Sequence, residues 1–174
     1  MLQHIWGWKV TGYNPVELPK FLFVVVPHTS NWDFLVGYFA SRMLGLESRF
    51  FAKKSLFKFP YGWFFRYLGG YPVERKKNIN QVDAIANIFN SHENFSAVIT
   101  PEGTRSYNPN WRTGFYYIAE KASLPIVLAG FDYPTKTVII NPPFQTTGNL
   151  EADIEKMKAF GRTIRAKFPE NGIK

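Results

Sequence analysis

A histidine and an aspartate, His28 and Asp33, are the residues of this sequence whose types and spacing best suit acid–base chemistry. An imidazole can take up a proton near neutral pH, and a nearby carboxylate can hold the ring in one orientation. On a regular helix, however, side chains five positions apart point about 140° away from each other. The pair therefore needs a bend, which Pro27 at a strand exit and a helix start at Ser30 or Asn31 would supply.

Both residues also have an ordinary structural role open to them. Asp33 falls where an acid in the first turn of a helix can reach back to a free backbone N–H, as in a capping box. His28 can be a polar residue at a strand exit whose hydrogen bonds are satisfied locally. Taken alone, the two residues leave both interpretations open.

A second polar cluster follows the apolar run at residues 97–100 and consists of Glu102, Gly103, Thr104 and Arg105. Gly103 permits a positive φ or a close approach to a ligand, Arg105 offers planar donors suited to a phosphate, and Glu102 can accept hydrogen bonds from hydroxyl groups. The alternative is a simple turn in which Glu102 and Arg105 pair with each other.

A third element, residues 69–75, ends in Arg75, which can hold an anionic headgroup or belong to a solvated basic strand end. The surrounding residues 49–77 contain eight basic residues, one acidic residue and ten aromatic residues, a net charge of +7 in a chain of +8. This mixture fits an anionic membrane surface or single-stranded nucleic acid. The remaining alternative is an aromatic core beside a solvated face of lysines.

Apolar periodicity and turn residues predict an α/β fold that would position these clusters. Strands are expected at residues 21–27, 49–53, 70–75, 95–101 and 125–133. Helices are expected at residues 31–44, 80–89, 112–122 and 150–168, with a hairpin or close turn before residues 137–140. We expect one layered domain over residues 1–174, with a mixed, mostly parallel central sheet flanked by helices. The first two polar clusters would then share the carboxyl edge of that sheet.

Composition excludes several classes of protein. The chain has no cysteine, which excludes disulfides, thiolate metal sites and a cysteine nucleophile, and is compatible with a reducing compartment. The longest apolar run, residues 21–27, is too short for a membrane-spanning helix, which needs about 20 apolar residues. No secretory signal pattern precedes it. We therefore expect a cytoplasmic protein that does not cross a membrane.

Together the clusters resemble the glycerolipid acyltransferase family, which includes the 1-acylglycerol-3-phosphate acyltransferases. Four ordered blocks carry the resemblance: the His-x4-Asp motif at His28 and Asp33, a second block at residues 70–75, a Glu-Gly-Thr-Arg block at residues 102–105, and an apolar-proline block at residues 124–127. Their order and spacing agree over roughly residues 21–131. Pro27 stands where many members have asparagine, and the long apolar N-terminal region of many members has no counterpart in this sequence.

The resemblance implies acyl transfer from acyl-CoA or acyl-carrier protein to a hydroxyl of a lysophosphatidic-acid-like acceptor in phospholipid biosynthesis, with no metal and no further cofactor. It implies that His28 is the general base and Asp33 its orienting acid. The acceptor and its phosphate would be bound by Arg75, Glu102, Gly103, Thr104 and Arg105. Peripheral contact with the anionic inner face of the cell membrane is expected, and a nucleic-acid partner is not. The alternatives are another lysolipid or amino-acid-lipid acceptor, or a non-catalytic basic binding module.

Overall fold

The structure is a computed structural model that describes residues 7–73 and 80–174. It contains a seven-stranded sheet in the order β1-β7-β6-β2-β5-β3-β4. The strands are β1 Lys9–Gly12, β2 Lys20–Val25, β3 Arg49–Lys53, β4 Gly70–Val73, β5 Phe95–Ile99, β6 Ile126–Asp132 and β7 Thr137–Ile140. The α-helices are α2 Trp32–Met43, α3 Gly62–Tyr67, α4 Gln81–Asn90, α5 Gly114–Lys121 and α6 Leu150–Arg162. Short 3-10 helices are η1 Pro15–Glu17, η2 Lys54–Phe57 and η3 Pro169–Asn171.

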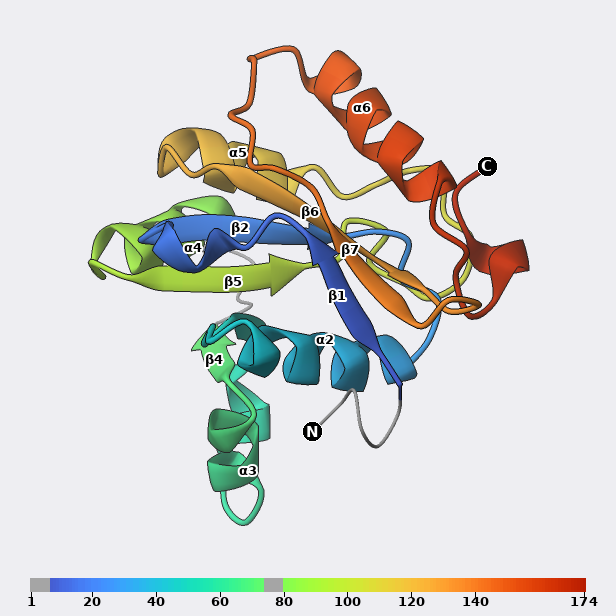
Figure 1. Cartoon of the computed structure of the whole chain (residues 1–174). Coiled ribbons are helices and arrows are strands. Elements are labelled where there is room, and N and C mark those ends of the chain that lie inside the picture. The colour runs from blue at the N-terminus through green and yellow to red at the C-terminus, as the bar shows by residue number, and fades with distance from the viewer. Residues whose placement is uncertain (1–6, 74–79) are drawn as a thin grey trace.

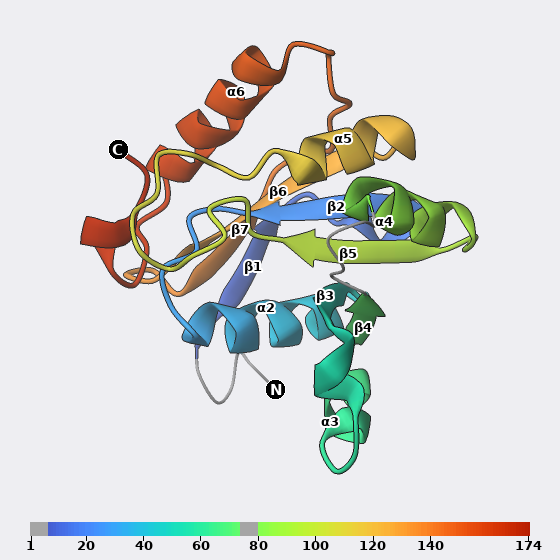
Figure 2. The same cartoon turned by 180° about the vertical axis from the view of Figure 1, so that it is seen from behind.

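The sheet is mixed but mostly parallel, as predicted. Strands β4, β3, β5, β2 and β6 pair in parallel, whereas β7 is antiparallel to β6 and β1 is parallel to β7. Helix α2 covers one face of the sheet, and α4, α5 and α6 cover the other (Figure 1; Figure 2). The predicted α/β layered fold is therefore confirmed.

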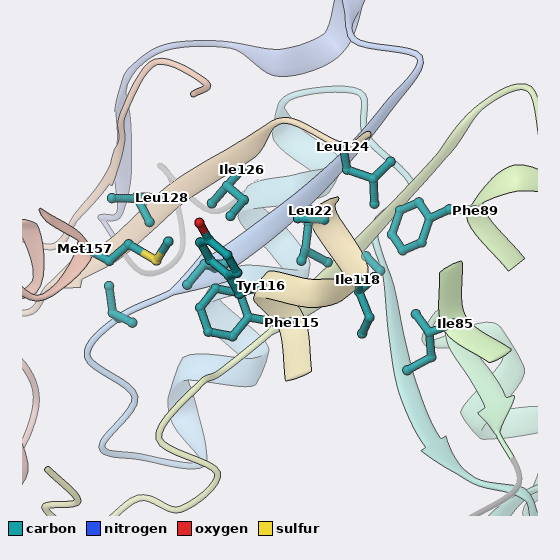
Figure 3. Close-up of a cluster of buried hydrophobic side chains, with 14 of the residues drawn as sticks. Leu22, Ile85, Phe89, Phe115, Tyr116, Ile118, Leu124, Ile126, Leu128 and Met157 are labelled. Carbon is teal, nitrogen blue, oxygen red and sulfur yellow. The ribbon is translucent and has the colours of Figure 1, made fainter. Parts of the chain in front are cut away.

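Strand β2 lies at the centre and is buried on both faces. Its successive side chains point to opposite sides. Leu22 (Figure 3) and Val24 belong to the cluster that includes residues of α4, α5 and α6, while Phe21 and Phe23 pack on the face that α2 covers. A parallel strand with helices on both faces has no solvated side. This explains why its sequence is an uninterrupted apolar run rather than an alternating one.

The predicted elements are all present, and most of their bounds agree within two residues. The predicted hairpin is also present, because β6 and β7 pair antiparallel with Asp132 opposite Thr137. The predicted end of the last helix at residue 168 is wrong, since α6 ends at Arg162. Beyond it, the backbone N–H and the guanidinium of Arg165 donate to Asp132 at 3.2 Å and 2.8 Å. Those bonds hold the chain against the end of β6, away from the helix axis.

Besides the short 3-10 helices, one strand and one α-helix were not predicted. Strand β1 is a mostly exposed edge strand of four residues, so its sequence has little apolar periodicity. Helix α3 has six residues and is rich in aromatic side chains, which gives it no helical pattern either. Together η2 and α3, residues 54–67, form an arm that projects from the layered body beside β4 (Figure 1; Figure 2). We call this segment the aromatic arm.

Candidate active site

His28 and Asp33 form a hydrogen-bonded pair in the turn between β2 and α2. The His28 Nδ1 atom lies 3.0 Å from Asp33 Oδ2. Asp33 is 3% exposed, whereas the His28 side chain is 21% exposed. The chain bends between the strand and the helix, so the two side chains meet although a regular helix would separate them. The predicted base and carboxylate are therefore brought together.

The Asp33 carboxylate also accepts hydrogen bonds from the backbone. Its Oδ2 atom accepts from the backbone N–H groups of Thr29 at 2.9 Å and Ser30 at 3.0 Å. The hydrogen bonds to the helix start and the contact with His28 thus use the same oxygen of Asp33. Of the two capping candidates, Ser30 rather than Asn31 accepts a hydrogen bond at the helix start. Its Oγ accepts from the backbone N–H of Trp32 at 3.2 Å.

These contacts determine which nitrogen of His28 can act as a base. An ionised carboxylate can only accept hydrogen bonds. The ring nitrogen that faces it must therefore be the N–H donor, so a neutral His28 carries its proton on Nδ1. The other ring nitrogen, Nε2, then carries the free lone pair. His28 is among the residues lining the large cavity described below, so Nε2 is the candidate base for a hydroxyl group bound there.

A residue that sequence reasoning missed completes the surroundings of Asp33. The Tyr133 hydroxyl donates to Asp33 Oδ1 at 2.6 Å. Tyr133 directly follows β6, the neighbour of β2 in the sheet. Its only signal in the sequence is this position, at the carboxyl end of a buried strand.

Glu102 lies beneath the site rather than in the cavity. Its Oε1 accepts from the backbone N–H of His28 at 3.1 Å, which ties the loop after β5 to the loop after β2. Among the described residues that line the cavity are Gly103, Thr104 and Arg105, but not Glu102. Burial, partly offset by backbone hydrogen bonds, raises the pKa of Glu102 from 4.5 to about 7. Its predicted part in acceptor binding stays a prediction.

The raised pKa of Glu102 predicts a pH-dependent stability. The folded protein holds this proton more tightly than the unfolded chain, so the free energy of unfolding falls as pH rises from 4.5 to about 7 and then levels off. The expected loss is roughly 3 kcal/mol. Glu102→Gln should remove that part of the slope, as measured by urea unfolding across this range. An unchanged slope in the variant would contradict this origin.

Gly103 has a packing reason for being glycine. Its φ is +65°, and a Cβ atom there would lie 2.7 Å from Nε of Arg112. Arg112 therefore packs on the bare backbone of Gly103, and Arg105 and Thr104 also line the cavity. Sequence reasoning placed Arg112 only at a helix start and missed it as a candidate anion-binding group.

A cavity of about 930 Å³ adjoins His28. The lining contains Thr104, Arg105 and Arg112 from the loop after β5, which Glu102 ties to His28, and also Arg42, Glu47 and Arg49 between the end of α2 and the start of β3. Most of the remaining lining is apolar and comes from the sheet, from α2 and the turn after it, and from α4 and α5; it includes Phe23, Val25, Phe34, Tyr38, Leu44, Leu46, Ile85, Phe115, Phe131, Val138 and Ile140. The cavity can therefore hold a long apolar chain with an anionic group near the imidazole.

One predicted site residue, Arg75, lies outside the described residues, as do Lys76 and Lys77. In the described parts of the chain, none of the helices combines the length and the apolar character needed to span a bilayer.

Comparisons with known proteins bear on the family and the fold. A family model described as Acyltransferase matches residues 8–131, which include His28, Asp33 and Gly103 but end before Tyr133. Among solved structures, the 1-acyl-sn-glycerophosphate acyltransferase PlsC from Thermotoga maritima is similar in fold, with a TM-score of 0.61 and 19% sequence identity. The similarity covers 93% of this chain and 74% of that one. A search among curated proteins found no match.

Proposed function

The chain belongs to the acyltransferase family, and from this premise we propose that it transfers a fatty acyl group from a thioester to a hydroxyl of a lysophosphatidic-acid-like lipid. The observation that carries the proposal is the placement of His28. Its Nδ1 is held by Asp33, and the ring adjoins a cavity that is apolar along most of its length. The donor is acyl-CoA or acyl-carrier protein.

The proposed reaction uses His28 first as a base and then as an acid. The acceptor hydroxyl oxygen attacks the thioester carbonyl carbon while its proton passes to His28 Nε2. The tetrahedral intermediate then expels the thiolate, which takes the proton from the imidazolium. A new ester and a free thiol result, and Asp33 remains ionised throughout because it stabilises the imidazolium without taking its proton. No Gly-x-Ser-x-Gly elbow occurs in the sequence, so the acceptor attacks directly.

Charge near His28 supports a phosphorylated acceptor. Arg105 and Arg112 both line the cavity and carry guanidinium groups suited to phosphate oxygens. We assign Thr104 and Gly103 to the same end, and Arg75 by resemblance. The acceptor named for the Thermotoga maritima enzyme, a lysophosphatidic acid, has a phosphate and a free hydroxyl on one small backbone, as this arrangement requires.

The test is product formation. The protein, incubated with palmitoyl-CoA or palmitoyl-acyl-carrier protein and lysophosphatidic acid, should release free thiol and form phosphatidic acid detectable by mass spectrometry. A panel of lysophospholipids with other headgroups and an amino-acid lipid decides between acceptors. Thiol release with a different acceptor alone would replace the lysophosphatidic acid assignment. Absence of acyl transfer to every acceptor would contradict the proposed function.

We further propose that the aromatic arm contacts an anionic membrane surface from the cytoplasmic side. Phe59 at its tip is 97% exposed, and Tyr61, Trp63 and Tyr67 are about 70% exposed. Four exposed cationic side chains accompany them: Lys53, Lys54, Lys58 and Arg66. Residues 48–73 contain no acidic residue. Aromatic rings favour the lipid interface, and each basic residue near an anionic bilayer adds about 1 kcal/mol of attraction.

The base of the arm also borders the cavity, because Phe65 and Leu68 are among its lining residues. A lipid acceptor could therefore pass from the membrane to His28 without crossing open water. This position supports a membrane-bound acceptor over a soluble one.

Removing two exposed rings of the arm should weaken membrane binding. We expect Phe59→Ala combined with Trp63→Ala to lower the partition onto phosphatidylglycerol-containing vesicles by about tenfold or more, since burying one large apolar side chain is worth about 1.5–3 kcal/mol. Vesicle sedimentation measures this. The control is Tyr117→Ala, which removes an exposed ring from α5, on the opposite side of the sheet from the arm (Figure 2). Equal binding by both variants, or no preference for anionic vesicles, would reject the assignment.

A further inference from the structure

Tyr133 lies against the residue that orients the proposed base. Its hydroxyl donates to Asp33 Oδ1 at 2.6 Å, across a separation of 100 positions in the sequence. Strands β6 and β2 are parallel neighbours, so Tyr133 and His28 leave the sheet at the same edge. The contact therefore follows directly from the strand order.

The two oxygens of Asp33 have different tasks. Oδ2 accepts from His28 and from the backbone N–H groups of Thr29 and Ser30. In the part of the chain that the structure describes, Oδ1 accepts from Tyr133 alone. A carboxylate rotates easily about its last bond, because terminal torsions of this kind have broad minima. A donor at Oδ1 limits that rotation and keeps Oδ2 facing His28.

The phenol ring is itself held from several sides. Trp8 packs edge-on against it, with the ring centroids 5.1 Å apart. The backbone N–H of Tyr133 donates to Arg165 O at 3.0 Å, and Lys167 Nζ lies 5.9 Å from the ring centroid. These contacts come from both ends of the chain. The residue that presents the hydroxyl to Asp33 is thus packed against Trp8 and bonded through its backbone to Arg165.

We propose that Tyr133 is a positioning residue for acyl transfer, whose hydroxyl holds the Asp33 carboxylate in the orientation that keeps the proton of His28 on Nδ1. The inference rests on the proposed function in that it assigns His28 as the base. Tyr133 acts through Asp33 and need not touch the substrate.

The Tyr133 hydroxyl can act as a donor at every pH at which the enzyme would be assayed. Burial, followed by the hydrogen bond and the charge of Asp33, raises the pKa of Tyr133 well above the usual value of 10. The hydroxyl therefore remains protonated and remains a donor.

The matched experiment compares Tyr133→Phe with Tyr116→Phe. Tyr116 also donates to a buried carboxylate, Asp153, at 2.8 Å, but that carboxylate accepts its other hydrogen bonds from Thr147 rather than from a histidine. Each variant loses one hydroxyl bound to one buried aspartate, so their effects on folding are comparable. Activity is expressed per folded molecule, with the folded fraction measured by circular dichroism.

We expect Tyr133→Phe to lower kcat by roughly tenfold or more, as the loss of a hydrogen bond to a charged group implies, with KM for both substrates nearly unchanged. The acidic limb of its pH–rate profile should move to higher pH, because Asp33 then concentrates its charge on His28. Tyr116→Phe should keep the wild-type kcat and profile. If Tyr133→Phe matches Tyr116→Phe in both, the inference is overturned.

A second readout separates this inference from the proposed function. Nitrogen-15 NMR of histidine-labelled protein should show His28 of the wild type as the Nδ1–H tautomer at neutral pH and a mixture of tautomers in Tyr133→Phe. Where the wild type transfers acyl groups, kcat decides, and an unchanged kcat overturns the inference whatever the tautomer. Where the wild type transfers none, the proposed function fails and the tautomer decides: an unchanged His28 tautomer overturns the positioning role.

Discussion

Replacing His28 by alanine should lower thioester-dependent acyl transfer by roughly 10²–10⁴-fold, the usual contribution of a general base. Nδ1 is bound to Asp33, which leaves Nε2 as the candidate base, and His28 is among the residues that line the cavity. KM for the acceptor should change little, since the cavity walls and the guanidinium groups remain. Free-thiol release with lysophosphatidic acid as acceptor measures the loss.

His92 provides the control for this variant. It lies outside the site, and its Nδ1 is 2.7 Å from the backbone carbonyl oxygen of Ile88. His92→Ala should therefore retain wild-type kcat even if its thermal stability falls. Equal thiol release by wild type and His28→Ala would remove His28 from the mechanism.

Asp33→Asn should reduce kcat by a similar amount, because an amide cannot accept from all the donors around it. Oδ2 accepts from His28 and from two backbone N–H groups, and Oδ1 accepts from Tyr133. An NH₂ group at either position must face a donor, and facing His28 it favours the tautomer with the proton on Nε2. The corresponding change in Ser-His-Asp enzymes costs about 10⁴-fold. The unfolding free energy should also fall by about 1–3 kcal/mol.

Asp153→Asn separates lost stability from lost catalysis. Asp153 is equally buried and accepts from Tyr116 and Thr147, distant from His28 in the fold. Its conversion to asparagine should destabilise the protein with little effect on kcat per folded molecule. If Asp33→Asn also keeps its kcat per folded molecule, the orienting role of Asp33 is wrong.

Much of the site was predictable because two apolar runs identified buried parallel strands. Polar clusters that follow such runs meet at one edge of the sheet, and the backbone N–H of His28 indeed donates to Glu102, 74 positions later. The two interpretations of Asp33 also proved compatible, since one oxygen serves both the helix start and the imidazole.

Other features depended on contacts that no local pattern reveals. Tyr133 and Arg112 come near His28 only through the order of the strands and the path of the loop after β5. Glu102 is the acidic residue of the Glu-Gly-Thr-Arg block, but its burial beneath the loops is known only from the folded structure. Similarly, α6 ends early because Asp132 binds Arg165, a partner 33 positions away.

The most direct test of the central claim is a crystal structure of the protein with lysophosphatidic acid bound in the absence of a thioester. We expect the free hydroxyl oxygen to lie within about 3 Å of His28 Nε2, with the phosphate against Arg105 and Arg112. A lipid bound in this cavity with its hydroxyl remote from the imidazole, or an imidazole turned so that Nδ1 faces the lipid, would contradict it.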